Sequence, residues 1–149
     1  MKHETIVIDN GAGTAKVGYA GQENPSCIIP NCTAKVKNQN QVLVGAETQD
    51  QIANSSQLVY TRPFDRGYLV NGATEVQVWQ HLLGRLGGGA AADPSTCALL
   101  ATVPPFMPPL LQEDIAQLVF EEFRFKSACL RPAASLVNWG LKQAEAGGN

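Results

Sequence analysis

Near its start the chain carries the run Ile8-Asp9-Asn10-Gly11-Ala12-Gly13-Thr14-Ala15-Lys16. The β-branched run Glu4–Asp9 predicts a strand, and Asp-Asn-Gly at the end of a strand is a strong turn signal. Glycine accepts positive φ and lets a bulky anion approach the backbone. Successive N–H groups in such a turn can form a nest for a β- or γ-phosphate. The run therefore predicts either a phosphate-binding loop or an ordinary hairpin turn.

Seven positions of this run are candidate nucleotide ligands. Asp9 could reach, through water, the Mg²⁺ that accompanies a nucleotide, and Lys16 could meet phosphate charge. The loop positions between them are Asn10, Gly11, Ala12, Gly13 and Thr14. The spacing does not match strand–loop–helix phosphate motifs, because no Gly-Lys-Ser follows the second glycine and the chain leads into another strand.

Further runs along the chain predict the strands of a mixed sheet. Lys16–Ala20 and Ser26–Ile29 would complete an antiparallel three-strand meander with the first strand. Cys97–Val103 is apolar on both faces, as a central strand buried under helices would be. Lys126–Leu130 would add another buried strand. Between the meander and the central strand, a polar, Gln/Asn-rich stretch predicts a small inserted subdomain at about residues 31–65.

Apolar residues at helical spacing predict the helices that flank this sheet. The first helix covers Val76–Leu86, with Thr74 as its cap and Trp79 on its core stripe. The second covers Leu111–Val119, and Pro132 is well placed in the first turn of a last helix. The order of elements predicts an α/β fold class, with one antiparallel group at its start.

Composition excludes several classes of function. The chain has 149 residues, is 44% hydrophobic and carries a formal net charge of −2, which is typical of one globular domain. Because no basic stripe is present, we expect no sequence-specific contact with nucleic acid. No apolar run approaches the ~20 residues that span a bilayer, so no membrane partner is expected. Met1–Glu4 lack the apolar segment of a signal peptide, which predicts a soluble, non-secreted chain.

The cysteines, histidines and paired acids form no catalytic or metal-binding pattern. The four cysteines contain no Cys-x-x-Cys pair and predict buried, reduced thiols, with a disulfide or a metal site as lesser alternatives; they are Cys27, Cys32, Cys97 and Cys129. His81 lies within the first predicted helix, where we expect it to face the surface or a partner. The acids at 113–114 and 121–122 predict a solvated helix face. No catalytic residue is expected.

From Ile8 to Gly21 the chain resembles the first phosphate loop of the actin superfamily. The resemblance continues in unbroken order to about Gly140, through residues 42–45, 67–71 and 78–81. Within the superfamily, three phrases are more similar to the sixth class of nuclear actin-related proteins than to conventional actin: Ile29–Cys32, Pro63–Asn71 and Phe120–Phe125.

The resemblance implies a fold, a cofactor and partners. The fold is actin-like and ribonuclease H-like, and residues 1–149 would form only its first, N-terminal lobe. The implied cofactor is ATP with Mg²⁺, bound weakly or not at all, because the second half of the cleft does not appear. The implied role is a noncatalytic subunit of a nuclear ATP-dependent chromatin remodeller that exchanges a variant histone. Its partners would be remodeller subunits, with histones or the nucleosome, in the nucleus or also the cytoplasm.

Departures from the family pattern argue against hydrolysis and polymerisation. Actin has a serine where Ala12 stands, so one hydroxyl contact to the γ-phosphate is absent. The glutamine that helps to position the attacking water in actin falls near Ala133, and its loss removes much of the catalysis. Thr33–Ser56 is shorter than the corresponding region of actin, which reduces the loop used in filament contacts. Nucleotide binding without effective hydrolysis or filament formation is the expectation.

Family members are much longer than this chain and place ATP between two similar halves. We therefore expect a fragment, a truncated gene model or a splice form, with apolar surface left exposed. Three alternatives to the interaction role remain open. They are an actin-like ATPase or sugar-kinase-like phosphotransferase, a cytoskeletal filament protein, and a truncated chain without independent activity.

Overall fold

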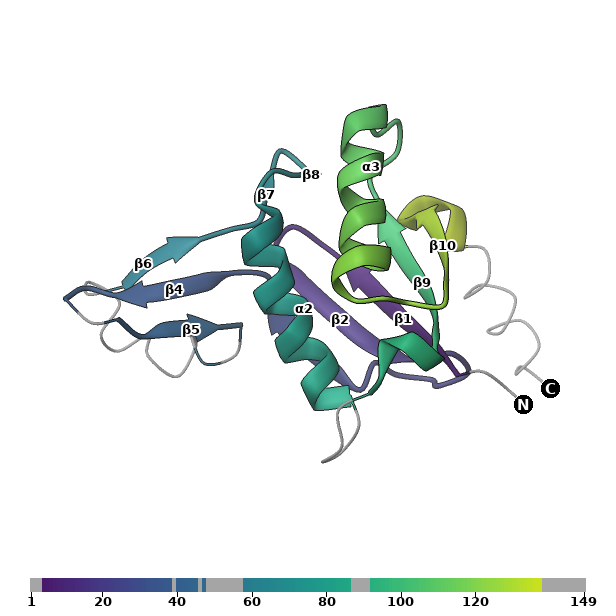
Figure 1. The fold of residues 1–149 in the computed structure, drawn as a ribbon, viewed down its shortest axis with the longest axis horizontal. Helices are drawn as coiled ribbons and strands as arrows, with labels where there is room; N and C mark the ends of the chain where they lie inside the picture. Colours follow the sequence, from purple (N-terminus) through teal and green to yellow (C-terminus); the bar gives the residue numbers. More distant parts are fainter. Residues whose placement is uncertain (1–3, 39, 46, 48–57, 87–91, 138–149) are drawn as a thin grey trace.

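A mixed five-stranded sheet forms the centre of the computed structural model (Figure 1). The structure describes residues 4–38, 40–45, 47, 58–86 and 92–137. The sheet order is β10-β9-β1-β2-β3. Its strands are β1 (Thr5–Asn10), β2 (Thr14–Tyr19), β3 (Cys27–Pro30), β9 (Ala98–Val103) and β10 (Ser127–Pro132).

The register of the sheet confirms the predicted meander and the central position of the strand predicted at Cys97–Val103, but only Leu99 and Ala101 of β9 are fully buried, so the expected burial of both faces is wrong. β1 pairs antiparallel with β2, placing Ile8 opposite Val17, and β2 pairs antiparallel with β3. β9 lies between β1 and β10 and runs parallel to both. The predicted α/β class with an antiparallel opening group is therefore confirmed for this sheet.

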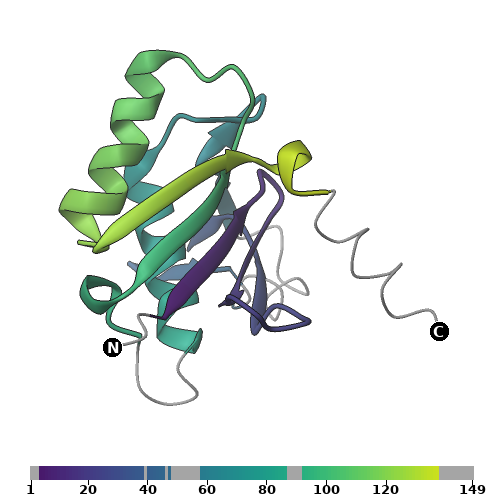
Figure 2. The same ribbon diagram turned by 90° about the vertical axis from the view of Figure 1, so that its right-hand side faces the viewer.

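Two helices cover one face of the sheet. They are α2 (Gly72–Leu86) and α3 (Pro109–Gln117), and α3 continues into a π-helical turn, η3 (Leu118–Glu122). Figure 2 shows α3 and η3 on one side of β9 and β10. Ile8 of β1 and Leu99 of β9 share one core cluster with Trp79 of α2, whose side chain is 1% exposed. The predicted core position of Trp79 is thus confirmed.

The prediction that the last strand is buried is wrong. β10 is an edge strand, and alternate residues along it are exposed to solvent. The exposed face carries Ser127, Cys129 and Arg131. The helices that cover the sheet lie on its other face, so nothing in the described part of the chain shields these side chains.

Two predicted helix starts are also wrong. The first helix begins at Gly72, and Asn71 Oδ1 accepts a hydrogen bond from the Thr74 backbone N at 3.0 Å. Asn71 is therefore the cap, and Thr74 lies inside the first turn. Pro132 ends β10 and precedes a short 3₁₀ helix, η4 (Ala133–Leu136). The remainder of the predicted last helix lies outside the described residues.

A second, three-stranded sheet extends to one side of the first (Figure 1). Its order is β5-β4-β6, and its strands are β4 (Thr33–Val36), β5 (Val42–Val44) and β6 (Leu58–Thr61). α2 contacts β4 and β5. A two-stranded hairpin of β7 (Phe64–Asp65) and β8 (Tyr68–Leu69) leads back to α2, and η2 (Pro94–Thr96) precedes β9.

The division into a lobe with a subdomain at about 31–65 stays a prediction. No helix in the described residues could cross a membrane.

Candidate functional site

The predicted loop occupies the turn between β1 and β2. The two strands are paired up to Asn10 and Ala15, so Gly11, Ala12 and Gly13 form the connection. β1 and β9 run parallel, and their carboxyl ends therefore reach the same edge of the sheet. In open α/β sheets, ligands bind in the crevice outside the carboxyl ends of the strands. The loop thus lies where the topology favours a ligand.

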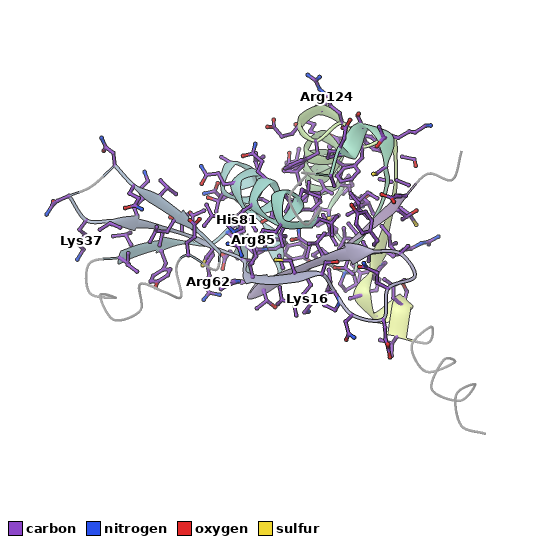
Figure 3. The ribbon with its side chains drawn as sticks, turned by 90° about the horizontal axis from the view of Figure 1, so that it is seen from below. Lys16, Lys37, Arg62, His81, Arg85 and Arg124 are labelled. Carbon is purple, nitrogen blue, oxygen red and sulfur yellow. The ribbon has the colours of Figure 1, made fainter. Side chains whose placement is uncertain are left out.

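Asp9 is held in place by its neighbours on the open face of the sheet. Lys16 Nζ lies 2.6 Å from Asp9 Oδ2, and Thr102 Oγ1 donates to Asp9 Oδ1 at 2.8 Å. The Asn10 backbone N donates to Thr102 Oγ1 at 2.8 Å, which ties β1 to β9. Figure 3 shows Lys16 on the side of the sheet away from α2. The predicted metal and phosphate residues therefore contact each other directly.

This arrangement keeps the Asp9 carboxylate ionised. Partial burial acts to raise its pKa, but hydrogen bonds from Lys16 and Thr102, with the Lys16 charge, outweigh burial and lower the pKa below its usual value. Both partners of the ion pair are about two-fifths exposed (40% and 42%). Because solvent screens such pairs, this one stabilises the fold by about 1 kcal/mol at most.

Asn31 anchors the loop from the opposite face and was missed as a site residue. Its side chain is 0% exposed. Its backbone N donates to the Gly13 carbonyl oxygen at 3.0 Å, and its Nδ2 donates to the Gly11 carbonyl oxygen at 3.0 Å. Within the described residues, the backbone N–H groups of Ala12 and Gly13 donate to no acceptor. The loop carbonyls are therefore fixed, and the N–H groups of Ala12 and Gly13 could donate to an anion.

A buried glutamate lies beneath the loop. Glu75 is 0% exposed, and neither of its carboxylate oxygens forms a hydrogen bond with the described residues. Burial is the main cause that raises its pKa to about 7, although the side chains of Asn10, Trp79 and Asn31 oppose this rise. Trp79 Nε1 donates to Asn10 Oδ1 at 3.3 Å. Glu75 precedes Trp79 by four residues on the apolar stripe of α2, and this spacing could have revealed it in the sequence.

The two loop glycines have different structural roles. A Cβ on Gly11 would lie 2.8 Å from the Thr14 carbonyl oxygen, so a side chain is sterically excluded there. A Cβ on Gly13 would meet no atom within 4 Å. Neither residue adopts positive φ. The positive φ that glycine allows is therefore not used at either position. Gly11 is required because a Cβ there would lie too close to the Thr14 carbonyl oxygen.

The residues present fit one side of a nucleotide–Mg²⁺ site. Asp9 offers an ionised oxygen donor, the type that Mg²⁺ prefers, and Lys16 offers a cation. Both line a hollow of about 290 Å³ beside the hairpin. No group of three or more potential metal ligands exists in the described part of the chain. A metal here would depend on phosphate oxygens and water for its remaining ligands.

The other candidates from the sequence have plain structural roles. All four cysteines are thiols, as predicted. Cys32 and Cys97 are buried and Cys27 is half-buried, but Cys129 is exposed on the edge strand, so the prediction of burial is wrong there. The acids at 113–114 and 121–122 are exposed, as predicted. His81 is half-buried, and its Nε2 has no hydrogen-bond partner in the described residues. Burial, with the nearby Arg85 charge, lowers its pKa.

Comparison with known proteins decides the family. The sequence model of the Actin family matches residues 1–146. This chain belongs to the actin family. Its relatives in that family include Actin-related protein 6 of Oryza sativa subsp. indica, which is 40% identical over 133 residues. Actin-related protein 6 of Arabidopsis thaliana is 36% identical over 136 residues, and that of Drosophila melanogaster is 32% identical over 136 residues.

The matches cover most of this chain and a small part of each relative. They span 89%, 89% and 91% of this chain, but 30%, 31% and 33% of the three relatives respectively. The predicted resemblance to the sixth class of actin-related proteins is thus confirmed for this N-terminal portion. The actin-like α/β fold of a partial first lobe is confirmed as well. The nucleotide-binding roles of Asp9, Lys16 and the loop stay predictions.

Proposed function

We propose that this chain is the loop-bearing N-terminal portion of a nuclear actin-related protein that acts as a noncatalytic subunit of an ATP-dependent chromatin remodeller. Remodeller subunits, with histones or the nucleosome, are its proposed partners. ATP with Mg²⁺ is its proposed ligand, with a structural role. The similarity to Actin-related protein 6 of several species supports the class of protein.

One observation carries the nucleotide part of the proposal. Asn31 holds the carbonyls of Gly11 and Gly13, while the amides of Ala12 and Gly13 donate to no described residue. The ionised carboxylate of Asp9 lies beside these amides and would accept hydrogen bonds from water bound to Mg²⁺. Lys16 would contact phosphate after its ion pair with Asp9 is replaced by one with the phosphate. The metal would supply charge neutralisation of the phosphates.

Two alanines support a noncatalytic role. Ala12 brings no hydroxyl to the tip of the loop, and Ala133 brings none to the position directly after β10. Phosphoryl transfer depends on positioning and electrostatics, so a site without a side chain that orients water loses much of its rate. ATP hydrolysis by this chain is expected at the rate seen in buffer alone.

Calorimetry and a radiolabelled-phosphate assay test the nucleotide part. With one wall of the cleft, the chain should bind Mg²⁺–ATP with a Kd weaker than micromolar, and Asp9→Ala should weaken binding further. Asp65→Ala, which removes an exposed carboxylate of β7 that does not line the hollow beside Asp9, is the matched control. Turnover that disappears in the Asp9 variant would overturn the noncatalytic role and favour an actin-like ATPase.

Affinity capture from nuclear extract tests the partner part. The tagged chain should recover remodeller subunits, identified by mass spectrometry, more strongly than a tagged control of unrelated fold. Recovery of actin-filament proteins alone would favour the cytoskeletal alternative.

A further inference from the structure

A second hollow lies between the start of α2 and the α3–η3 segment, and neither Asp9 nor the residues of the loop line it. Its volume is about 620 Å³, larger than the hollow beside Asp9. We call it the α2–α3 groove. One wall comes from β8 and α2, through Leu69, Val70, Gly72 and Val76. The other wall comes from α3 and η3, through Leu111, Asp114, Gln117, Leu118, Glu121 and Glu122.

The floor of the α2–α3 groove is apolar. Leu69 and Leu118 are buried and close its base, while Val76 and Leu111 are half-buried on its two sides. Val70 is 63% exposed at its edge. A contiguous apolar hollow rimmed by polar residues is typical of a surface that contacts another molecule.

The rim of the groove is acidic. Asp114, Glu121 and Glu122 are exposed, and no lysine or arginine lines the groove. None of these three acids takes part in an ion pair with another described residue. The rim therefore presents concentrated negative charge beside apolar surface.

The groove wall also contains a rare backbone feature. The chain changes from α-helix to a π-helical turn at Leu118, and this turn carries Glu121 and Glu122 to the rim. π-helical turns are rare and occur frequently at functional sites. Helical spacing places Leu111, Asp114 and Leu118 in one row along this wall, and an elongated partner can lie along that row.

We propose that the α2–α3 groove binds a short amphipathic helix of another protein, with aliphatic side chains on its apolar stripe and lysine or arginine along its flanks. Helix-in-groove binding needs an apolar stripe in an apolar channel, and complementary charge sets orientation and selectivity. The acidic rim disfavours nucleic-acid phosphates and acidic peptides. A second copy fits poorly, because the chain itself carries a net charge of −2. The inference does not depend on nucleotide binding or on which complex the chain joins.

A defined peptide pair tests the proposal on the whole chain. The probe is a fluorescein-labelled helical peptide of about 18 residues with leucine on one stripe and lysine on the flanks. Its partner is the same peptide with glutamate in place of lysine. Fluorescence anisotropy should show saturable binding of the lysine peptide only, and binding should weaken roughly fivefold or more between about 50 mM and 300 mM NaCl because the rim charges are screened.

Two matched pairs of variants locate the binding surface. Glu121→Lys changes the rim, whereas Glu113→Lys makes the same charge change on an exposed position of α3 outside the groove. Val70→Asp changes the groove edge, whereas Val59→Asp changes an exposed valine on β6. The groove variants should weaken the affinity for the lysine peptide roughly tenfold, a loss of about 1.4 kcal/mol in binding free energy. The control variants should weaken it less than about twofold.

Unfolding midpoints in urea confirm that each variant is folded, and all four positions are exposed enough to tolerate change. Equal weakening by Glu113→Lys and Glu121→Lys would mean general charge attraction and would overturn the proposal. So would saturable binding of the glutamate peptide, failure of both peptides to bind, or dimerisation of the chain through Val70. Loss of nucleotide binding by Asp9→Ala, with peptide binding intact, would separate this inference from the proposed function.

Discussion

The side-chain amide of Asn31 donates to the carbonyl oxygen of Gly11 at 3.0 Å, although 20 residues separate them in sequence. The backbone N of Asn31 also donates to the Gly13 carbonyl oxygen. One buried residue at the end of β3 therefore fixes both sides of the β1–β2 turn. A turn that is fixed before a ligand arrives loses less entropy on binding, so Asn31 acts as a positioning residue for the loop.

Asn31→Ala should destabilise the chain by about 1–3 kcal/mol, because it leaves the Gly11 carbonyl without its buried donor. Urea unfolding monitored by circular dichroism measures the change. Asn24→Ala, at an exposed position, is the control and should lie within about 0.5 kcal/mol of the parent chain. Equal midpoints for Asn31→Ala and the parent would show that the side-chain contact does not hold the loop.

Gly11→Ala and Gly13→Ala form a matched pair in the loop. The Cβ on residue 11 would lie 2.8 Å from a backbone oxygen, which forces the turn to shift at a cost of about 1–3 kcal/mol. The Cβ on residue 13 meets open space without positive φ, so that variant should match the parent or gain up to about 1 kcal/mol from reduced chain entropy. Thermal and urea unfolding rank the pair, and the reverse ranking would contradict this geometry.

Glu75→Gln should remove a pH dependence of stability. The folded-state pKa of Glu75, about 7, lies above its ordinary value of 4.5, so the folded chain binds this proton more tightly than the unfolded chain. Stability is therefore greatest below the unfolded pKa, falls as the pH rises from 4.5 through 7, and then levels off. The difference corresponds to about 3 kcal/mol.

The neutral amide introduced by Glu75→Gln mimics the protonated acid, so the gain of this variant over the parent should reach up to about 3 kcal/mol near pH 8 and vanish near pH 4.5. Urea midpoints measured across this range provide the comparison. Glu113→Gln, at an exposed position on α3, is the control, and its urea midpoints should match those of the parent across this pH range. A parent chain whose stability rose between these pH values would refute the predicted sign.

Cys129 should react with iodoacetamide before the buried thiols of Cys32 and Cys97. It is exposed on the open face of β10, whereas Cys32 and Cys97 are buried. Thiol reactivity requires access as well as thiolate character. Mass spectrometry of peptides from briefly treated native chain should find label at Cys129 before either buried thiol, and denaturation in urea should make the rates similar. Earlier labelling of Cys97, which directly precedes β9, would mean that the start of β9 opens more readily than the edge strand.

Local sequence signals were sufficient for much of the fold. The meander could be predicted because β-branched runs and the Asn-Gly turn are local signals, and β9 could be predicted because a short, continuous apolar run is typical of a central strand. The position of β10 could not be predicted correctly, because an apolar strand can lie at the centre or the edge of a sheet, and distant neighbours decide which. β4 and β6 were missed because strands of four residues carry a weak local signal and pair through contacts outside their own segments.

The amino-acid sequence alone determined the family resemblance, the strand–loop–strand run around Gly11 and the two charged candidates, Asp9 and Lys16. These depend on residue identity and on contacts between near neighbours along the chain. Only the tertiary structure decided that Asp9 and Lys16 pair with each other, that Asn31 holds the loop and that Glu75 is buried beneath it. Burial and hydrogen bonding between distant segments set these relationships, because desolvation depends on what packs against a side chain and not on its neighbours in sequence.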